Sequence, residues 1–201
     1  MFYHPHTVQA RATTALGPVR LAASPEGLCG VWFEGQRHEP THWLHGERAW
    51  AEAAGHTLLQ EAAGQLQQYL QGVRDGFDLP LDLSGGTGFQ QEVWRALLAI
   101  GRGGTTSYGR LSQQLGRPLA VRAVGAAVGR NPLSVVVPCH RVLGADGSLT
   151  GYAGGLERKT ALLVLENVPG QAAHAHVAPG HPVQRLLLPA APSTLQKKAH
   201  A

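Results

Sequence analysis

Long apolar runs are missing from this chain of 201 residues, and none reaches the ~18 residues that a membrane-spanning helix needs. Residues 1–11 are polar and contain no apolar core of a secretory signal. Cysteine is equally scarce: Cys29 and Cys139 are the only two, which is too few for a disulfide scaffold. We therefore expect a cytoplasmic protein in a reducing compartment, with no membrane segment.

Charged residues are few as well, 15% against 43% hydrophobic residues, and this excludes an intrinsically disordered chain. The formal net charge of +4 is unevenly distributed. Residues 1–100 carry a net charge of −4, residues 101–166 one of +5, and residues 167–201 one of +3. Such asymmetry points to a nucleic-acid-binding face. The alternative is an ordinary surface followed by a basic tail.

The first 84 residues have the pattern of a mixed α/β domain. Apolar residues over 15–21 and 28–33, separated by Ser-Pro-Glu-Gly at 24–27, predict two strands joined by a tight turn. Helical spacing of apolar residues over 58–70 predicts a helix, with Gly72 at its C-terminal cap. Strict alternation over 77–83 predicts a half-buried strand, and Pro80 places that strand at a sheet edge.

A glycine-rich linker at 84–88 separates this α/β domain (residues 1–84) from a mainly α domain (residues 85–168). The pattern predicts a helix over 89–101 and two short helices over 108–115 and 119–129. The turn Gly-Arg-Pro at 116–118 joins the short pair into a helix-turn-helix. Residues 169–201 hold no acidic residue, and we expect them to form a flexible tail.

The second helix of the pair consists almost entirely of small residues, including Ala123, Ala126 and Ala127. A helix that reads bases in the major groove would carry amide or cationic side chains, and only Arg122 fits that role. Small residues allow close approach, either to another helix or to a DNA minor groove, which is roughly 6 Å wide. The residues alone leave both readings open.

The candidate reactive centre follows Ser-Val-Val-Val at 134–137, which predicts a short buried strand that stops at Pro138. Cys139 is then presented at a rigid turn beside His140 and Arg141, the kind of neighbours that lower a thiol pKa. A general base could act on the thiol directly or through one water. An inert buried cysteine is the alternative, and we expect that role for Cys29, which lies within a strand pattern.

Cys139 and its neighbours resemble a motif of a known family. Pro-Cys-His-Arg-Val at 138–142 resembles the active-site signature of the O6-alkylguanine-DNA alkyltransferases. Further matches follow in the family's order: Ser-Tyr-Gly at 107–109, Arg-Ala-Val-Gly at 122–125, Asn-Pro at 131–132, Gly-Tyr-Ala-Gly-Gly-Leu at 151–156, and Glu166. The resemblance is close over residues 87–168 and looser over residues 16–33, which look like the N-terminal domain of bacterial members.

The resemblance implies DNA repair by direct, single-turnover transfer of an alkyl group from guanine O6 to Cys139. His140 would be the base, acting through a water, and Glu166 would orient its imidazole. Asn131 would brace the turn that carries the cysteine. Tyr108 would give a proton to N3 of the leaving guanine.

The resemblance also assigns the binding residues. The main-chain carbonyls of Cys139 and Val142 would accept from the guanine amine, the N–H of Ala153 would contact O6, and Tyr152 would line the pocket wall. Here Ala153 replaces a serine found in some members.

Arg122 would fill the gap left by the flipped base, while Ala123, Ala126 and Ala127 would enter the minor groove. The basic residue of this segment is Arg130, whose position differs from that of the basic residue in some members. The expected partner is double-stranded DNA carrying O6-alkylguanine, with O4-alkylthymine as a second candidate lesion. The protein would act as a monomer without a cofactor.

Three histidines, at 38, 42 and 45, form the one cluster that suggests a metal, and some family members carry an N-terminal zinc. The supporting cysteines are missing here, so we expect a solvated loop and no metal. Two rival functions remain. One is a non-catalytic protein that binds alkyl lesions, and the presence of Cys139 counts against it. The other is a cysteine hydrolase built on Cys139, His140 and Glu166, for which the sequence supplies no evident substrate cleft.

Overall fold

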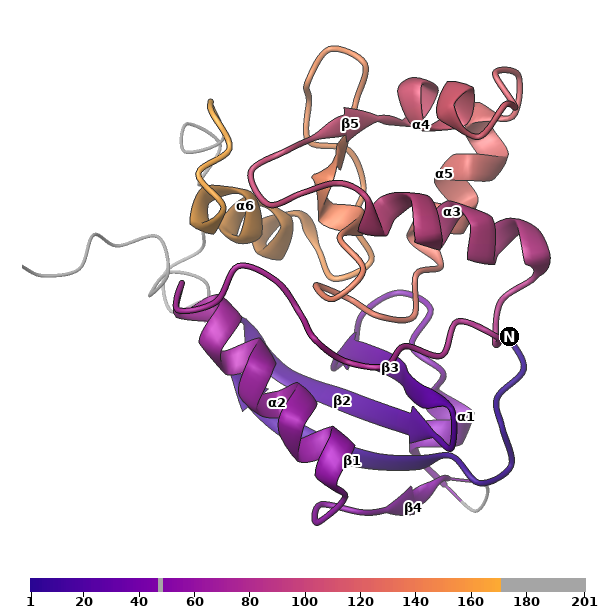
Figure 1. Cartoon of the computed structure of the whole chain (residues 1–201), viewed down its shortest axis with the longest axis vertical. Helices are drawn as coiled ribbons and strands as arrows, with labels where there is room; N and C mark the ends of the chain where they lie inside the picture. The colour runs from indigo at the N-terminus through magenta and orange to yellow at the C-terminus, as the bar shows by residue number, and fades with distance from the viewer. Residues whose placement is uncertain (47–48, 171–201) are drawn as a thin grey trace, which may run out of the picture.

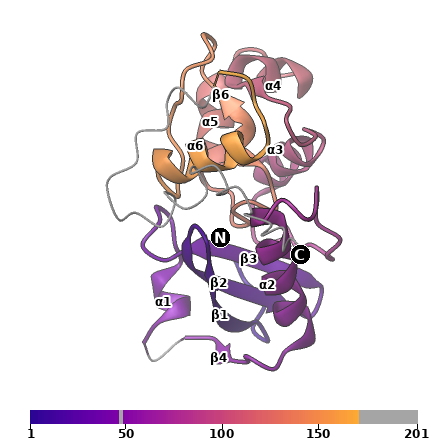
Figure 2. The same cartoon turned by 90° about the vertical axis from the view of Figure 1, so that its left-hand side faces the viewer.

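The computed structural model describes residues 1–46 and 49–170, and it places a helical domain on top of a sheet domain (Figure 1). The turned view shows β3 (Gly27–Phe33) as the strand of the sheet domain nearest the helical domain (Figure 2). This is the predicted fold class, an α/β domain followed by a mainly α domain. The boundary at 84/85 stays a prediction. The predicted tail, apart from Pro169 and Gly170, lies outside the described residues.

Four strands form the N-terminal sheet in the order β3-β2-β1-β4. β1 (Val8–Thr14) and β3 run antiparallel to β2 (Gly17–Ser24), and β4 (Ala51–Glu52) runs parallel to β1. The two predicted strands correspond to β2 and β3. β1 was not predicted because its sequence, Val-Gln-Ala-Arg-Ala-Thr-Thr, has few large apolar residues, although Gln9 and Ala10 are buried.

One face of the sheet is covered by α2 (Thr57–Leu70), which confirms the predicted helix (Figure 1). Its apolar face buries Leu59, Leu66 and Tyr69 in the main core, and Gly72 follows with φ +73°. The other face carries a separate cluster that includes Trp32 and Trp50, near the short α1 (Thr41–Leu44). A side chain at Gly30 would place its Cβ 1.8 Å from the Trp32 ring, so only glycine fits there.

The predicted edge strand over 77–83 is wrong as a strand, although its place beside the sheet is right. The segment makes a single parallel bridge between Leu81 and Leu28. The Leu28 N–H donates to the Pro80 carbonyl (2.8 Å), and the Asp82 N–H donates to the Leu28 carbonyl (2.9 Å). The ladder stops because the next part of the β3 edge is occupied by residues 132–134, bridged at Val31.

The helical domain contains α3 (Gly88–Leu98), α4 (Tyr108–Gln114), α5 (Val121–Gly129) and α6 (Leu156–Leu165), with β5 (Thr106–Ser107) paired to β6 (Val142–Leu143). Thr87 caps α3 through a capping box and Ser107 caps α4, so polar side chains fix both helix starts. α4 and α5 form the predicted helix-turn-helix. No helix in the described part of the chain is long and apolar enough to cross a membrane.

The valine run is buried, but the predicted strand over 134–137 is wrong. The chain turns at 134–136, and Val135 adopts φ +72°, a conformation that β-branched residues rarely take. β-Propensity reports how well a side chain fits a buried surface rather than a fixed backbone preference, so the same residues serve in a buried turn. This turn leads through Pro138 into a single 3-10 turn, η1 (Cys139–Arg141).

Candidate active site

Asn131 holds the cysteine turn from the inside. Its amide Nδ2 lies 2.8 Å from the Val137 carbonyl, 3.3 Å from the Leu133 carbonyl and 3.0 Å from Cys139 Sγ. Its Oδ1 accepts from the Leu133 N–H at 2.9 Å. One buried side chain therefore connects the backbone of the turn to the thiol at its end.

Replacing Asn131 with alanine is expected to destabilise the protein by about 1–3 kcal/mol, because buried groups of the turn lose their partner. Urea unfolding of N131A against the wild type measures this loss. The matched control is Gln114→Ala, which removes an exposed amide on α4. Equal unfolding free energies for N131A and the wild type would contradict the role of Asn131 in the turn.

The two cysteines are both buried, and both are free thiols. Burial raises the pKa of Cys29 to about 12 and also raises the pKa of Cys139 above its ordinary value. The sequence neighbours His140 and Arg141 therefore do not bring the Cys139 pKa below its ordinary value, contrary to what the sequence suggested. Arg141 turns away to other partners, and the hydrogen bond from Asn131 opposes burial only in part. A resting thiol of this kind needs a base at the moment of reaction.

His140 is fully buried, and burial lowers its pKa, so the imidazole is neutral near pH 7. Its Nε2 lies 2.6 Å from Glu166 Oε1. An ionised carboxylate only accepts, so Nε2 carries the hydrogen and Nδ1 carries the lone pair. Nδ1 has no hydrogen-bond partner among the described residues. The ring of Tyr152 stands edge-on to the imidazole, with centroids 6.4 Å apart.

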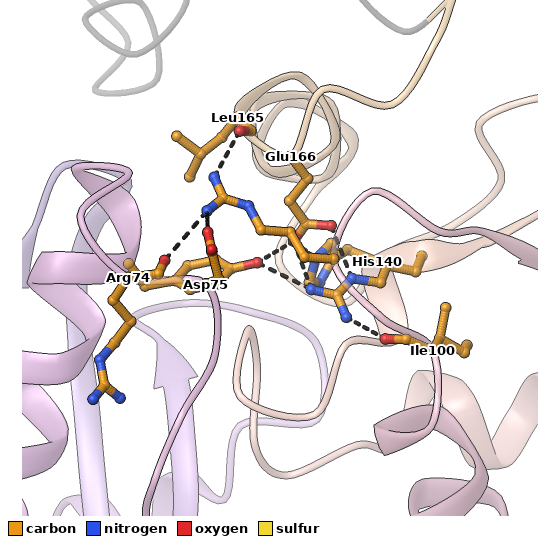
Figure 3. A network of polar contacts seen from close by, with 9 residues as sticks. Arg74, Asp75, Ile100, His140, Leu165 and Glu166 are labelled. Atoms are coloured by element: carbon orange, nitrogen blue, oxygen red, sulfur yellow. Dashed lines mark hydrogen bonds and ion pairs between the residues drawn. The ribbon is translucent and has the colours of Figure 1, made fainter.

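Glu166, the residue after α6, is the centre of a buried polar network (Figure 3). Burial alone would raise its pKa, but His140, Arg141 and Tyr69 hold that pKa well below the ordinary value. Arg141 donates through Nε to Oε2 (2.8 Å) and through Nη2 to Oε1 (3.1 Å), and it also bonds the Ile100 carbonyl. Tyr69 of α2 donates to Oε1. Sequence reasoning missed Tyr69, because a helix-spaced tyrosine in an apolar face reads as core.

Lys159 is a second residue that the sequence did not single out. It is fully buried on α6, and its Nζ donates to the carbonyls of Val142 (2.6 Å) and Thr150 (2.8 Å). Burial lowers its pKa to about 8. The bonds join the chain just after Cys139 to the loop before Tyr152. Lys159 therefore binds the Val142 carbonyl, which the resemblance assigned as a guanine contact.

A pocket of about 500 Å³ opens between α4, α5 and residues 150–153. Three predicted ligand residues, Tyr108, Tyr152 and Ala153, line it together with Arg122 and Arg130. Gly154 follows this segment and leaves no room for a side chain, since a Cβ there would lie 2.8 Å from the Tyr152 ring. The lining also includes two sheet-domain residues: Arg37, which the sequence did not indicate, and His38, which it indicated only as part of a histidine cluster.

The small residues of α5 divide between its two faces. Arg122, Ala123 and Ala126 are exposed, as is Arg130 just beyond the helix. Ala127 is buried, and its carbonyl accepts from Trp94 Nε1 of α3 at 2.9 Å. The assignment of Ala127 to a DNA contact is therefore wrong, because this residue packs α5 on α3. Helix packing therefore accounts for the buried face of α5, and the minor-groove contact of the exposed face stays a prediction.

Only part of the +5 charge of residues 101–166 lies on the surface. Arg141 is buried in the Glu166 network, Lys159 is buried against the Val142 and Thr150 carbonyls, and Arg102 pairs with Asp75 and donates to the Leu165 carbonyl. A further arginine, Arg158 of α6, crosses to the sheet domain, where it donates to the Leu16 carbonyl (2.8 Å) and stacks on Phe33. These cations hold the molecule together rather than forming an external face.

The histidines at 38, 42 and 45 do not form a ligand set. His38 lines the pocket, whereas His42 packs on Trp43 with ring centroids 5.1 Å apart. Within residues 1–46 and 49–170, no three His, Cys, Asp or Glu side chains are grouped so as to hold a metal ion.

Comparison with known proteins assigns both domains to one family. Residues 88–168 match the DNA binding domain of 6-O-methylguanine DNA methyltransferase, and residues 8–83 match the ribonuclease-like domain of the same family. The methylated-DNA–protein-cysteine methyltransferase of Mycobacterium bovis is 47% identical over 153 residues, which cover 75% of this chain and 87% of that protein. The inducible enzyme of the same name from Bacillus subtilis is 45% identical over 145 residues, covering 69% and 80%.

The solved structures agree. The crystal structure of Mycobacterium tuberculosis OGT in complex with DNA matches with a TM-score of 0.70 and 43% identity, covering 82% of this chain and 96% of that one. The chain belongs to the O6-methylguanine DNA methyltransferase family.

Proposed function

We propose that this protein repairs DNA by moving an alkyl group from O6 of guanine to Sγ of Cys139, once per molecule. The observation that carries the proposal is the neutral His140, which is oriented through Nε2 by the buried carboxylate of Glu166 and follows Cys139 directly. Together with the family membership, this arrangement supports nucleophilic transfer to a thiol. No step requires a cofactor.

The reaction forms one bond and breaks one. Cys139 Sγ attacks the alkyl carbon, and the bond from that carbon to guanine O6 breaks. The thiol proton passes to Nδ1 of His140, through a water or directly, and Glu166 stabilises the imidazolium that results. Asn131, which donates to Sγ in the resting protein, stabilises the developing thiolate. The product is S-alkylcysteine and unmodified guanine.

The leaving guanine accumulates negative charge on its ring, and Tyr108 is placed to donate a proton to N3. Tyr108 lines the pocket at the start of α4, and its hydroxyl accepts from Thr150 Oγ1 at 3.4 Å. Solvent then restores the phenol. The N–H of Ala153 and the ring of Tyr152, which line the same pocket, complete the guanine site.

The substrate is double-stranded DNA, with the damaged nucleotide extruded into the pocket at a cost of a few kcal/mol. Arg122, Ala123 and Ala126 form the exposed face of α5 that enters the minor groove. Arg130 lies at the end of that face, where it contacts phosphate. We propose O6-alkylguanine as the main lesion, O4-alkylthymine as a second one, and a monomer as the acting species.

Intact-protein mass spectrometry after incubation with an O6-methylguanine oligonucleotide tests the proposal. The expected result is a gain of one methyl group on Cys139 and a reaction that stops after one equivalent. DNA binding without a mass change would establish the rival lesion-binding protein, and continued turnover of a model ester would establish a hydrolase. Either outcome would overturn the proposed function.

Replacing Arg122 with alanine is expected to slow transfer from duplex DNA roughly tenfold or more, since extrusion needs a few kcal/mol and each 1.36 kcal/mol is tenfold in rate. Transfer from free O6-benzylguanine, which needs no extrusion, stays near the wild-type rate. Single-turnover kinetics on both substrates measure the difference, with Arg95→Ala on α3 as the control for an exposed arginine. Equal losses on both substrates would refute the role of Arg122 in extrusion.

A further inference from the structure

The carboxylate behind His140 is held by both domains. Oε1 of Glu166 receives the His140 Nε2–H from the helical domain and the Tyr69 hydroxyl from α2 of the sheet domain. Residues 69 and 166 are far apart in the sequence, yet their side chains meet where the domains join. A residue of the N-terminal domain therefore contacts the same oxygen atom that orients the imidazole.

The direction of the tyrosine hydrogen bond is fixed by its surroundings. Arg141 Nη2 donates to the Tyr69 oxygen at 3.1 Å, so the hydroxyl hydrogen is left to point at Glu166. The tyrosine ring packs against Phe77, with centroids 4.9 Å apart, and Arg102 lies 5.4 Å above the ring centroid. Tyr69 is only 1% exposed. Packing of the ring therefore fixes the position of the hydroxyl, and the hydrogen bond from Arg141 makes the hydroxyl a donor to Glu166.

We propose that Tyr69 is a positioning residue for alkyl transfer, whose hydroxyl fixes Oε1 of Glu166 and sets how strongly that oxygen supports His140. The inference rests on the proposed function of Cys139. A carboxylate oxygen that accepts an additional hydrogen bond has its negative charge partly neutralised, so it stabilises a neighbouring imidazolium less. Tyr69 thus limits the basicity of His140 while it keeps the imidazole in place.

Tyr69→Phe removes only the tyrosine hydroxyl and leaves in place the other charged and titratable groups around Glu166 and His140. They are Arg141 and Cys139 of η1, Lys159 of α6, Tyr152, and Arg102 with its partner Asp75. Arg141 Nη2 also donates to Glu166 Oε1, so Tyr69→Phe leaves it with a partner. The variant is therefore expected to fold and to isolate the effect of one hydroxyl.

The test is the single-turnover rate of Tyr69→Phe with free O6-benzylguanine across the pH range. We expect a loss of about tenfold at neutral pH, because the imidazole is held less firmly and is protonated in a larger share of the molecules; tenfold is the lower end of what losing the partner behind a metal-ligating histidine causes. The acid limb of the pH–rate profile moves to higher pH, because an imidazole facing a less neutralised carboxylate holds its proton more tightly. A lower melting temperature with the wild-type rate and pH profile would overturn the proposal.

Two controls separate the hydroxyl from the domain contact. Tyr3→Phe removes a sheet-domain hydroxyl that bonds Met1 and lies away from the network, and Asp75→Asn weakens the Arg102 pair between the domains without touching Glu166. Both are expected to keep the wild-type pH profile. If the wild type itself gains no alkyl group, the proposed function fails, whereas an alkylated wild type with an unchanged Tyr69→Phe profile refutes only the role of Tyr69.

Discussion

Cys139→Ala is expected to abolish alkyl transfer and to leave binding to duplex DNA intact. The alanine removes the only atom that receives the alkyl group, so the expected rate is zero rather than reduced. The α5 residues that we propose to contact DNA are exposed and lie outside the cysteine turn, so they keep their positions. Intact mass and a gel-shift titration on the same O6-methylguanine duplex measure the two properties separately.

Cys29→Ala is the matched control, because it removes the other buried thiol. Burial raises the Cys29 pKa to about 12, which leaves almost no thiolate at neutral pH. This variant is expected to gain one alkyl group at the wild-type rate. An alkyl group found on Cys29 of the Cys139→Ala protein would contradict the assignment of the acceptor.

Glu166→Gln is expected to slow transfer roughly 10²- to 10⁴-fold, the range lost when a carboxylate no longer supports a catalytic histidine. The amide keeps the shape but not the charge that stabilises the imidazolium. It also leaves Arg141 without its ion pair in a buried site, which destabilises the fold by about 3–5 kcal/mol. Single-turnover kinetics and urea unfolding measure the two losses.

The stability loss of Glu166→Gln has a predictable pH dependence. The pKa of Glu166 is held below its ordinary value of 4.5, so the unfolded chain takes up the proton first as the pH falls. The contribution of the Glu166 carboxylate to the free energy of unfolding is therefore complete above pH 4.5. It decreases as the pH falls below that value toward the pKa of the folded protein. The difference in unfolding free energy between wild type and variant should narrow in acid. A difference that is independent of pH would show that Glu166 is not a charged partner of Arg141.

Local chemistry made the helices predictable. Thr87 and Ser107 cap α3 and α4, and the apolar spacing over 58–70 and the glycine after it mark α2. The strand predicted over 134–137 is wrong because Asn131 binds the backbone of this segment, and a local pattern does not include that contact.

Some residues of the candidate site could likewise be predicted from the sequence, and others could not. Cys139 and His140 could be predicted as a candidate reactive centre from the run at 138–142, whereas the role of Glu166 followed only from the resemblance to the family. Tyr69 and Arg37 could not, because they reach the site only when the two domains meet. Long-range contacts of this kind leave no periodic signal in either segment.

The outer edge of β3 links displacement of the cysteine turn to aggregation of the protein. The backbone groups along this edge that do not bond β2 bond residues 80–82 and the cysteine turn. In the turn, the Val31 N–H donates to the Pro132 carbonyl and the Val31 carbonyl accepts from the Ser134 N–H. If the turn is displaced, part of a strand edge loses its cover and becomes a template for other chains. The integrity of the reactive turn and the resistance of the protein to aggregation therefore depend on the same two hydrogen bonds.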